Sequence, residues 1–180
     1  ASRRPIENHK MQHSHSVKVK DTFLLLTCIG IESSSVKDID TDTLRSLSQN
    51  DWNDVRIMAD KQGVSAIVFD GLCQIVNQYG NNQIIPDFEA SWWQQFVYDW
   101  MGSMLMTENR NCQQKIVIND MASRWVNNGC RVMIFKGQAS ATLYPKPEHR
   151  SPGDVDCYLF ENYAKGNDVS HLASSLQGAF

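Results

Sequence analysis

The chain has 180 residues, of which 42% are apolar and 21% charged, and its 17 lysines and arginines against 20 aspartates and glutamates give a net charge of −3. This composition is ordinary for a globular protein, and the length suits one domain or little more. It excludes binding of a nucleic-acid backbone along the whole chain, which needs an excess of basic residues. No apolar run approaches the about 20 residues of a membrane-spanning helix, so we expect no membrane partner.

The cysteines are odd in number, and none forms a Cys-x-x-Cys pair. Each has apolar neighbours in the sequence, which is typical of reduced core cysteines and not of a disulfide framework or a zinc site. Because disulfides are rare in the cytosol, this usage predicts a cytoplasmic protein. The cysteines are Cys28, Cys73, Cys112, Cys130 and Cys157.

The first part of the chain is predicted to be helical after a polar start. Residues 1–20 are almost devoid of apolar side chains and are predicted to be a flexible tail or a cloning remnant. Residues 21–128 are predicted to form a helical region. In it, Asp21 caps a short helix that ends at Gly30, and the polar residues 32–42 form a loop.

Two further helices are predicted before residue 81. Ser48 and Asp51 have the spacing of a capping box, which predicts a helix from there to Gly63. The next helix carries apolar residues three and four positions apart and ends at Gly80.

A third apolar helix follows, rich in tryptophan and methionine. Pro86 suits its first turn, and Gly102 is predicted to divide it because glycine weakens a helix interior. The pattern stops just before Gly129. An aromatic face at this spacing could stack on a ligand, but it belongs to the protein core more often.

The pattern changes after Gly129. Residues 130–135 are apolar and β-branched, as in a buried strand, and residues 154–160 resemble a second strand. A short helix is predicted between them over 138–144, and another helix over 167–178. Residues 129–180 are therefore predicted to form a βαβα unit, and the whole chain an α+β protein with an α/β-like core.

Two aspartates stand at the start of the second predicted strand. Because side chains alternate along a strand, Asp154 and Asp156 are expected on one face, with Val155 on the other. Two neighbouring carboxylates repel each other unless a cation or a basic group lies near. Mg²⁺ is bound in proteins by one or two carboxylates together with substrate phosphates, so the pair is a candidate metal and catalytic site.

Basic residues and a glycine bracket this pair. Gly137 would let a phosphate approach the backbone, and the helix that follows offers free N–H groups. Lys136 and Arg150 would add positive charge. Each feature alone is common, and the alternative interpretation is an acidic strand edge that nearby basic side chains neutralise.

The order of these features resembles a known family. Phe135-Lys136-Gly137, Leu143-Tyr144-Pro145, Arg150 and Gly153-Asp154-Val155-Asp156 resemble the signature of the uncharacterised nucleotidyltransferases, over roughly residues 21–165. That family is a branch of the DNA polymerase β-type nucleotidyltransferase superfamily.

The resemblance implies nucleotidyl transfer from an NTP. Two Mg²⁺ ions would lie between the carboxylates and the nucleotide, with Asp154 and Asp156 as catalytic metal ligands. Lys136, Gly137, Gln138 and Arg150 would form the nucleotide- and phosphate-binding set.

The sequence departs from the superfamily pattern at two points. The superfamily usually has Gly-Ser where this chain has Gly137-Gln138, and it uses a third carboxylate on a later strand. Glu161 and Asp168 fall where a helix is predicted to begin. We therefore expect residues 129–180 to be the N-terminal part of a longer nucleotidyltransferase core, whose incomplete sheet could pair with another copy.

Three functions are compatible with these features. The first is a Mg²⁺-dependent nucleotidyltransferase acting on an unknown small-molecule or macromolecular acceptor. The second is a catalytically inactive relative that binds a nucleotide or a partner protein, and the third is an interaction module formed by the helical region. With no basic helix and no zinc spacing, sequence-specific DNA recognition is not expected.

Overall fold

The computed structural model describes residues 5–32, 39–80, 84 and 90–161, with side chains from Val17 onward except that of Glu161. Its elements are α1 (Pro5–Ile31), α2 (Thr41–Arg45), α3 (Gln49–Lys61), α4 (Ser65–Tyr79), α6 (Ala90–Asn127), β1 (Cys130–Phe135), α7 (Gly137–Ala141), the 3₁₀ helix η1 (Pro147–His149) and β2 (Asp156–Glu161). The predicted α+β class with a helical N-terminal region is confirmed.

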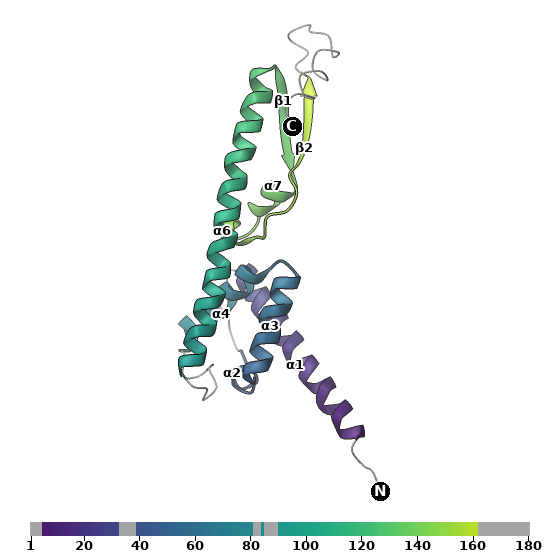
Figure 1. Cartoon of the computed structure of the whole chain (residues 1–180), viewed down its shortest axis with the longest axis vertical. Coiled ribbons are helices and arrows are strands. Elements are labelled where there is room, and N and C mark those ends of the chain that lie inside the picture. Colours follow the sequence, from purple (N-terminus) through teal and green to yellow (C-terminus); the bar gives the residue numbers. More distant parts are fainter. Residues whose placement is uncertain (1–4, 33–38, 81–83, 85–89, 162–180) are drawn as a thin grey trace.

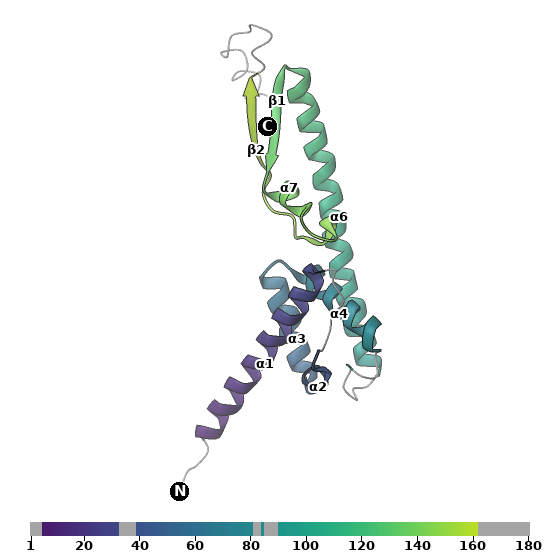
Figure 2. The same cartoon turned by 180° about the vertical axis from the view of Figure 1, so that it is seen from behind.

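The long helix α6 organises the molecule. It has 38 residues, which corresponds to a length of about 57 Å at 1.5 Å per residue. In Figures 1 and 2, α1 to α4 gather around its N-terminal half, and β1, β2 and α7 lie along its C-terminal half. The elongated shape follows because one helix supports two separate groups of elements.

Helices α1 and α4 cross in close contact through two glycines. A Cβ on Gly30 would lie 2.0 Å from the main-chain oxygen of Ile67, and a Cβ on Gly71 would lie 2.0 Å from that of Leu26. Real Cβ atoms do not approach oxygen so closely, so only glycine permits this spacing at either position. The glycine that the sequence predicts to end a helix at residue 30 therefore has a packing role.

An aromatic and aliphatic core joins α1, α3, α4 and α6. Trp52 and Trp100 are fully buried, and Phe96 lies between them with ring centroids 6.3 Å and 5.4 Å away. The indole N–H of Trp100 donates to the Ser65 hydroxyl at 2.9 Å. The predicted core role of the tryptophan-rich face of α6 is confirmed for its N-terminal half.

Local signals for helix ends agree with the structure in α3 and α4. Ser48 and Asp51 form a complete capping box at the start of α3. Gly80, with φ 83°, follows the last residue of α4. These ends were predictable because capping depends on residues within one turn of each other.

Two predicted helix limits are wrong. Asp21 does not start a helix, because α1 begins at Pro5 and continues through Asp21 without a break; its first turns are polar and show no apolar period. Gly102 does not divide α6. A single glycine weakens a helix by only about 1 kcal/mol, and α6 has buried residues on both sides of Gly102, among them Trp100 and Asn111. Pro86 and residues 167–178 lie outside the described residues.

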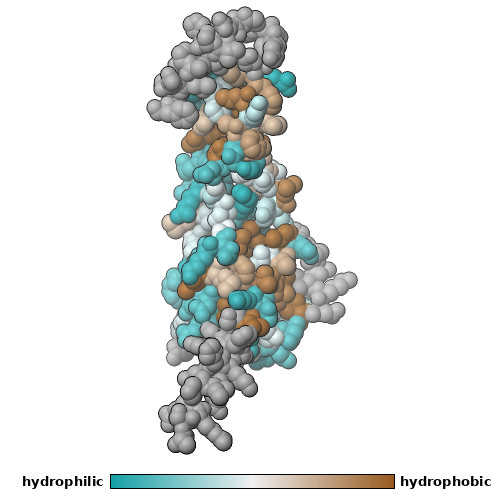
Figure 3. Space-filling model, turned by 90° about the vertical axis from the view of Figure 1, so that its right-hand side faces the viewer, coloured by the Kyte–Doolittle hydropathy of each residue, from teal (hydrophilic) through white to brown (hydrophobic). Residues whose placement is uncertain are grey.

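The strands β1 and β2 pair antiparallel, with Phe135 opposite Asp156 and Cys130 opposite Glu161. β1 has the predicted bounds, whereas β2 begins at Asp156, two residues later than predicted. The outer face exposes Met133, Tyr158 and Phe160, and apolar surface is visible below the grey atoms at the top of Figure 3. Pairing of this sheet with another copy stays a prediction.

The five cysteines differ in their exposure to solvent. All five cysteines are free, as predicted, but Cys28 and Cys112 are exposed and only Cys130 is buried. Apolar neighbours in the sequence were therefore a poor guide to the burial of Cys28 and Cys112, because both lie on helices that have one exposed face. Within the described ranges, no helix has both the length and the apolar character of a membrane span.

Candidate functional site

The turn after β1 has an unusual backbone. Lys136 has φ 59° and ψ −163°, a conformation found almost only in glycine, which typically costs about 1–3 kcal/mol in other residues. Gly137 follows with φ 44° and opens α7. Strained residues of this kind concentrate at functional sites, because only a specific requirement retains them.

This turn is closed by the loop that precedes β2. A Cβ on Gly137 would lie 2.7 Å from the main-chain oxygen of Asp154, so the two segments touch through their backbones. The guanidinium of Arg150 donates to the main-chain oxygen of Gly137 at 3.1 Å. The structure thus brings together Lys136, Gly137, Arg150 and Asp154, which the sequence predicted to share one site.

Arg150 is half-buried, and its two recorded acceptors are the main-chain oxygens of Gly137 and Ser151, at 3.1 Å and 3.5 Å. Among the residues that the structure describes, no carboxylate pairs with it. A half-buried guanidinium has to find an anion or water for its remaining N–H groups. Arg150 is therefore suited to bind an anionic ligand.

The two aspartates lie in different local structures. Asp154 is exposed and lies in the irregular segment before β2, whereas Asp156 is the first residue of that strand. The prediction that both lie on the strand is wrong, and the argument from alternation applies to Asp156 alone. The Asp156 carboxylate lies 3.7 Å from the Lys136 ammonium; the lysine side chain is exposed, and that of Asp156 is half-buried. Such a pair is worth little to stability.

The side chain of Gln138 points toward α6. Its amide nitrogen donates to the side-chain oxygens of Asn111 and Gln114, at 2.6 Å and 2.7 Å. A contact between Gln138 and phosphate stays a prediction. The side-chain amide nitrogen would not be its donor, because both of its hydrogens already have acceptors. The sequence analysis missed Asn111 and Gln114. The sequence contains only a faint indication of their role. They lie at the three- and four-residue spacing of the buried face of α6, counted from Trp100, but they are polar.

A second polar cluster holds the residue before Arg150. The ring of His149, only 3% exposed, has Nδ1 2.5 Å from a carboxylate oxygen of Asp70 and Nε2 2.8 Å from one of Glu108. Lys146 donates to the other Asp70 oxygen at 2.6 Å. This hydrogen bond raises the pKa of Lys146 above its ordinary value. The cluster ties α4 and α6 to the loop, and no local pattern in the sequence pointed to it.

A match to a known protein family includes all of the residues described above for this site. Residues 48–166 match the family model described as uncharacterised nucleotidyltransferase. The chain belongs to this family. No curated protein and no solved structure matches the chain.

Membership in the uncharacterised nucleotidyltransferase family supports nucleotidyl transfer as the general activity and an NTP as the substrate. The matched range contains α3, α4, α6 and every predicted site residue, whereas α1 and α2 precede it. The predicted resemblance is therefore confirmed at the level of the family.

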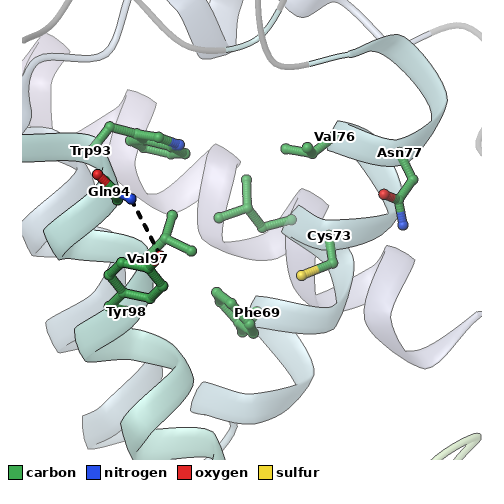
Figure 4. Close-up of a pocket in the computed structure, with 9 residues that line it drawn as sticks. Phe69, Cys73, Val76, Asn77, Trp93, Gln94, Val97 and Tyr98 are labelled. Carbon is green, nitrogen blue, oxygen red and sulfur yellow. Dashed lines mark hydrogen bonds between the residues drawn. The ribbon is translucent and has the colours of Figure 1, made fainter. Parts of the chain in front are cut away.

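A cavity of about 470 Å³ lies elsewhere in this family member, between α4 and the first turns of α6. Figure 4 shows its mostly apolar side chains and the hydrogen bond from Gln94 to the Tyr98 hydroxyl at 3.3 Å. Burial is the main cause that raises the pKa of the Cys73 thiol in its wall. No predicted site residue lines the cavity. Its lining residues are Phe69, Leu72, Cys73, Val76, Asn77, Trp93, Gln94, Val97 and Tyr98.

Proposed function

We propose that this protein is a Mg²⁺-dependent nucleotidyltransferase domain that transfers a nucleotidyl group from an NTP to an acceptor. The observation that carries the proposal is the closure of the Lys136–Gly137 turn by the Arg150–Asp154 loop. It places a half-buried guanidinium without a carboxylate partner, within the described residues, next to a strained turn and two aspartates.

Phosphate binding is assigned to the turn and to Arg150. Lys136 and Arg150 supply positive charge, and Gly137 supplies the positive φ that the close contact with the Asp154 main chain requires. In α7 the first helical hydrogen bond is donated by Ala139, so the N–H groups of Gly137 and Gln138 precede it and can donate to phosphate oxygens. The part assigned to Gln138 is this main-chain donor.

Asp154 and Asp156 are assigned to the metal. Within the described ranges, no three His, Cys, Asp or Glu side chains group as a metal site. Two accessible carboxylates nevertheless suit Mg²⁺, which keeps several waters and takes its other ligands from substrate phosphates. One or two Mg²⁺ ions bound there would neutralise charge on the triphosphate and orient it.

The reaction is a substitution at the α-phosphorus. An acceptor oxygen forms a bond to this phosphorus, the bond to the bridging oxygen of the β-phosphate breaks, and pyrophosphate leaves with the electron pair. The acceptor proton passes to solvent or to a base. Lys136 and Arg150 would hold the phosphates in line for this exchange.

The test is a calorimetric titration of ATP, GTP, CTP and UTP, with and without Mg²⁺. We expect at least one nucleotide to bind only with Mg²⁺, and the Asp154→Ala/Asp156→Ala variant to lose this binding. Asp120→Ala is the matched control, because Asp120 is an exposed aspartate on α6 that pairs with Arg124. Absence of nucleotide binding by the unchanged protein would contradict the proposal.

Turnover separates catalysis from binding. With an α-labelled NTP, transfer to water or to an added acceptor releases pyrophosphate and labelled product. Mg²⁺-dependent binding without any pyrophosphate release would favour the alternative, a catalytically inactive nucleotide-binding relative.

A further inference from the structure

Two amide side chains of α6 face the closed loop. Asn111 and Gln114 are three residues apart and therefore lie on the same side of the helix. Asn111 is only 1% exposed, although asparagine is rarely buried so completely. A buried amide persists only where its hydrogen-bonding groups find partners.

These amides bind the main chain of the loop. The Asn111 side-chain nitrogen lies 2.7 Å and 2.8 Å from the main-chain oxygens of Glu148 and Arg150. The Gln114 side-chain nitrogen donates to the main-chain oxygen of Gly153 at 2.6 Å. The loop is thus fastened to α6 on both sides of the Arg150 side chain and immediately before Asp154.

Gln138 completes the arrangement from the other side. Its amide nitrogen donates to Asn111 Oδ1 at 2.6 Å and to Gln114 Oε1 at 2.7 Å. Because both acceptors are fixed by Gln138, their nitrogens are directed at the loop oxygens. One side chain at the start of α7 therefore orients both amides, together with the main-chain oxygen of Thr107, which lies 3.2 Å from the Asn111 side-chain nitrogen.

We propose that Gln138, Asn111 and Gln114 form an amide latch that positions Arg150 and Asp154 against the Lys136–Gly137 turn. In this assignment the Gln138 side chain is a positioning group and not a phosphate ligand. The functional part of the inference rests on the nucleotide site proposed above, whereas the latch itself does not.

The latch is tested without any ligand by amide hydrogen exchange. In Asn111→Ala we expect the His149 amide, which donates to the Lys146 oxygen, to exchange about tenfold faster or more, because loss of the bonds to the Glu148 and Arg150 oxygens frees the loop. Exchange in α3 and α4 should stay unchanged. Asn119→Ala is the matched control, because Asn119 is an exposed asparagine on the same helix. Unchanged exchange in the loop would overturn the latch.

Gln138→Ser gives a second and independent variant. It introduces the hydroxyl residue that the wider superfamily has at this position, but it removes both amide contacts. If the side chain positions the loop, Mg²⁺-ATP should bind about tenfold more weakly, and loop exchange should rise as in Asn111→Ala. Gln113→Ser, at an exposed position of α6, should change neither. Equal or tighter binding by Gln138→Ser would contradict the positioning role.

A double-variant cycle shows whether the latch acts through Arg150. If it does, Asn111→Ala should weaken Mg²⁺-ATP binding in the unchanged background but add little to Arg150→Ala. Additive losses would show that Asn111 acts independently of Arg150 and would overturn this part. If the unchanged protein binds no NTP, the proposed function fails, and hydrogen exchange still decides on the latch.

Discussion

The two halves of α6 are packed in different ways. The N-terminal half joins α1, α3 and α4 through large apolar side chains such as Trp52, Phe96 and Trp100. The C-terminal half meets the loop before β2 through Asn111 and Gln114, and the buried residues there include His149. One helix thus serves an apolar core at one end and a polar network at the other.

The difference reflects what each half has to do. Apolar packing is strong and has little directional preference, so it stabilises a fold while tolerating small shifts. Hydrogen bonds require defined distances and angles, and an unmade one is costly when buried. A site that must hold two loops against each other is better fixed by hydrogen bonds.

The apolar half should be most sensitive at its closest contact. In Gly71→Ala, the new Cβ would lie 2.0 Å from the main-chain oxygen of Leu26. We expect a loss of about 3 kcal/mol or more in the free energy of unfolding, measured with urea. Gly102→Ala is the control, because nothing lies within 4 Å of that Cβ. It should stabilise α6 by about 1 kcal/mol. Similar values for the two variants would contradict the described crossing of α1 and α4.

The connection between the two halves should depend on Asp70. Asp70→Asn takes the carboxylate away from Lys146 and leaves the buried His149 with that of Glu108 alone. We expect a loss of about 2–3 kcal/mol in the free energy of unfolding. Asp120→Asn, which breaks an exposed pair with Arg124, should change it by less than about 1 kcal/mol.

The pH range for the Asp70 measurement follows from the raised pKa of Lys146. A lysine whose folded pKa is raised contributes stability that is complete below the unfolded value, near 10.5, and is lost as the pH rises through the folded value. The contribution of this pair should therefore be constant between pH 7 and pH 9 as far as Lys146 is concerned. A loss in Asp70→Asn no larger than in Asp120→Asn would show that the cluster is unimportant.

The polar half should be sensitive to a single methyl group at Gly137. Gly137→Ala places a Cβ 2.7 Å from the main-chain oxygen of Asp154 and requires φ 44° of an alanine. We expect about 2 kcal/mol lower stability and loss of Mg²⁺-ATP binding. Gly153→Ala is the matched control, with open space around its Cβ. If both variants bind nucleotide equally, the contact between the two loops does not shape the site.

The smallest effect is expected at Lys136, where the backbone is strained. Lys136→Gly and Lys136→Ala remove the same charge, so they should weaken Mg²⁺-ATP binding to the same extent. Only glycine relaxes φ 59°. Glycine loses more conformational entropy on folding than alanine, which offsets part of the relieved strain. We therefore expect the free energy of unfolding of Lys136→Gly to be about 1 kcal/mol higher than that of Lys136→Ala. The reverse order would argue against strain at this turn.

Part of this structure follows from local sequence. The capping box at Ser48 and Asp51, the end of α4 at Gly80 and the bounds of β1 depend on residues within a few positions of each other. The predicted grouping of Lys136, Gly137, Arg150 and Asp154 was accessible for the same reason. These residues lie within 19 positions of each other and flank one short helix.

The remainder depended on contacts that local patterns do not contain. The polar N-terminal turns of α1 gave no apolar period, and the unbroken course of α6 through Gly102 depends on packing at both of its ends. Asp154 was predicted on a strand because alternation does not reveal where pairing stops. Pairing ends at Phe135 and Asp156, where the turn after β1 begins.

The sequence by itself determined the family, the α+β class and the proximity of Lys136, Gly137, Arg150 and Asp154. Only the tertiary structure decided that Gln138 faces Asn111 and that His149 meets Asp70, 79 positions away. The physical reason is that helix, turn and strand preferences arise between near neighbours. Hydrogen bonds across the chain exist only once packing has brought their partners together.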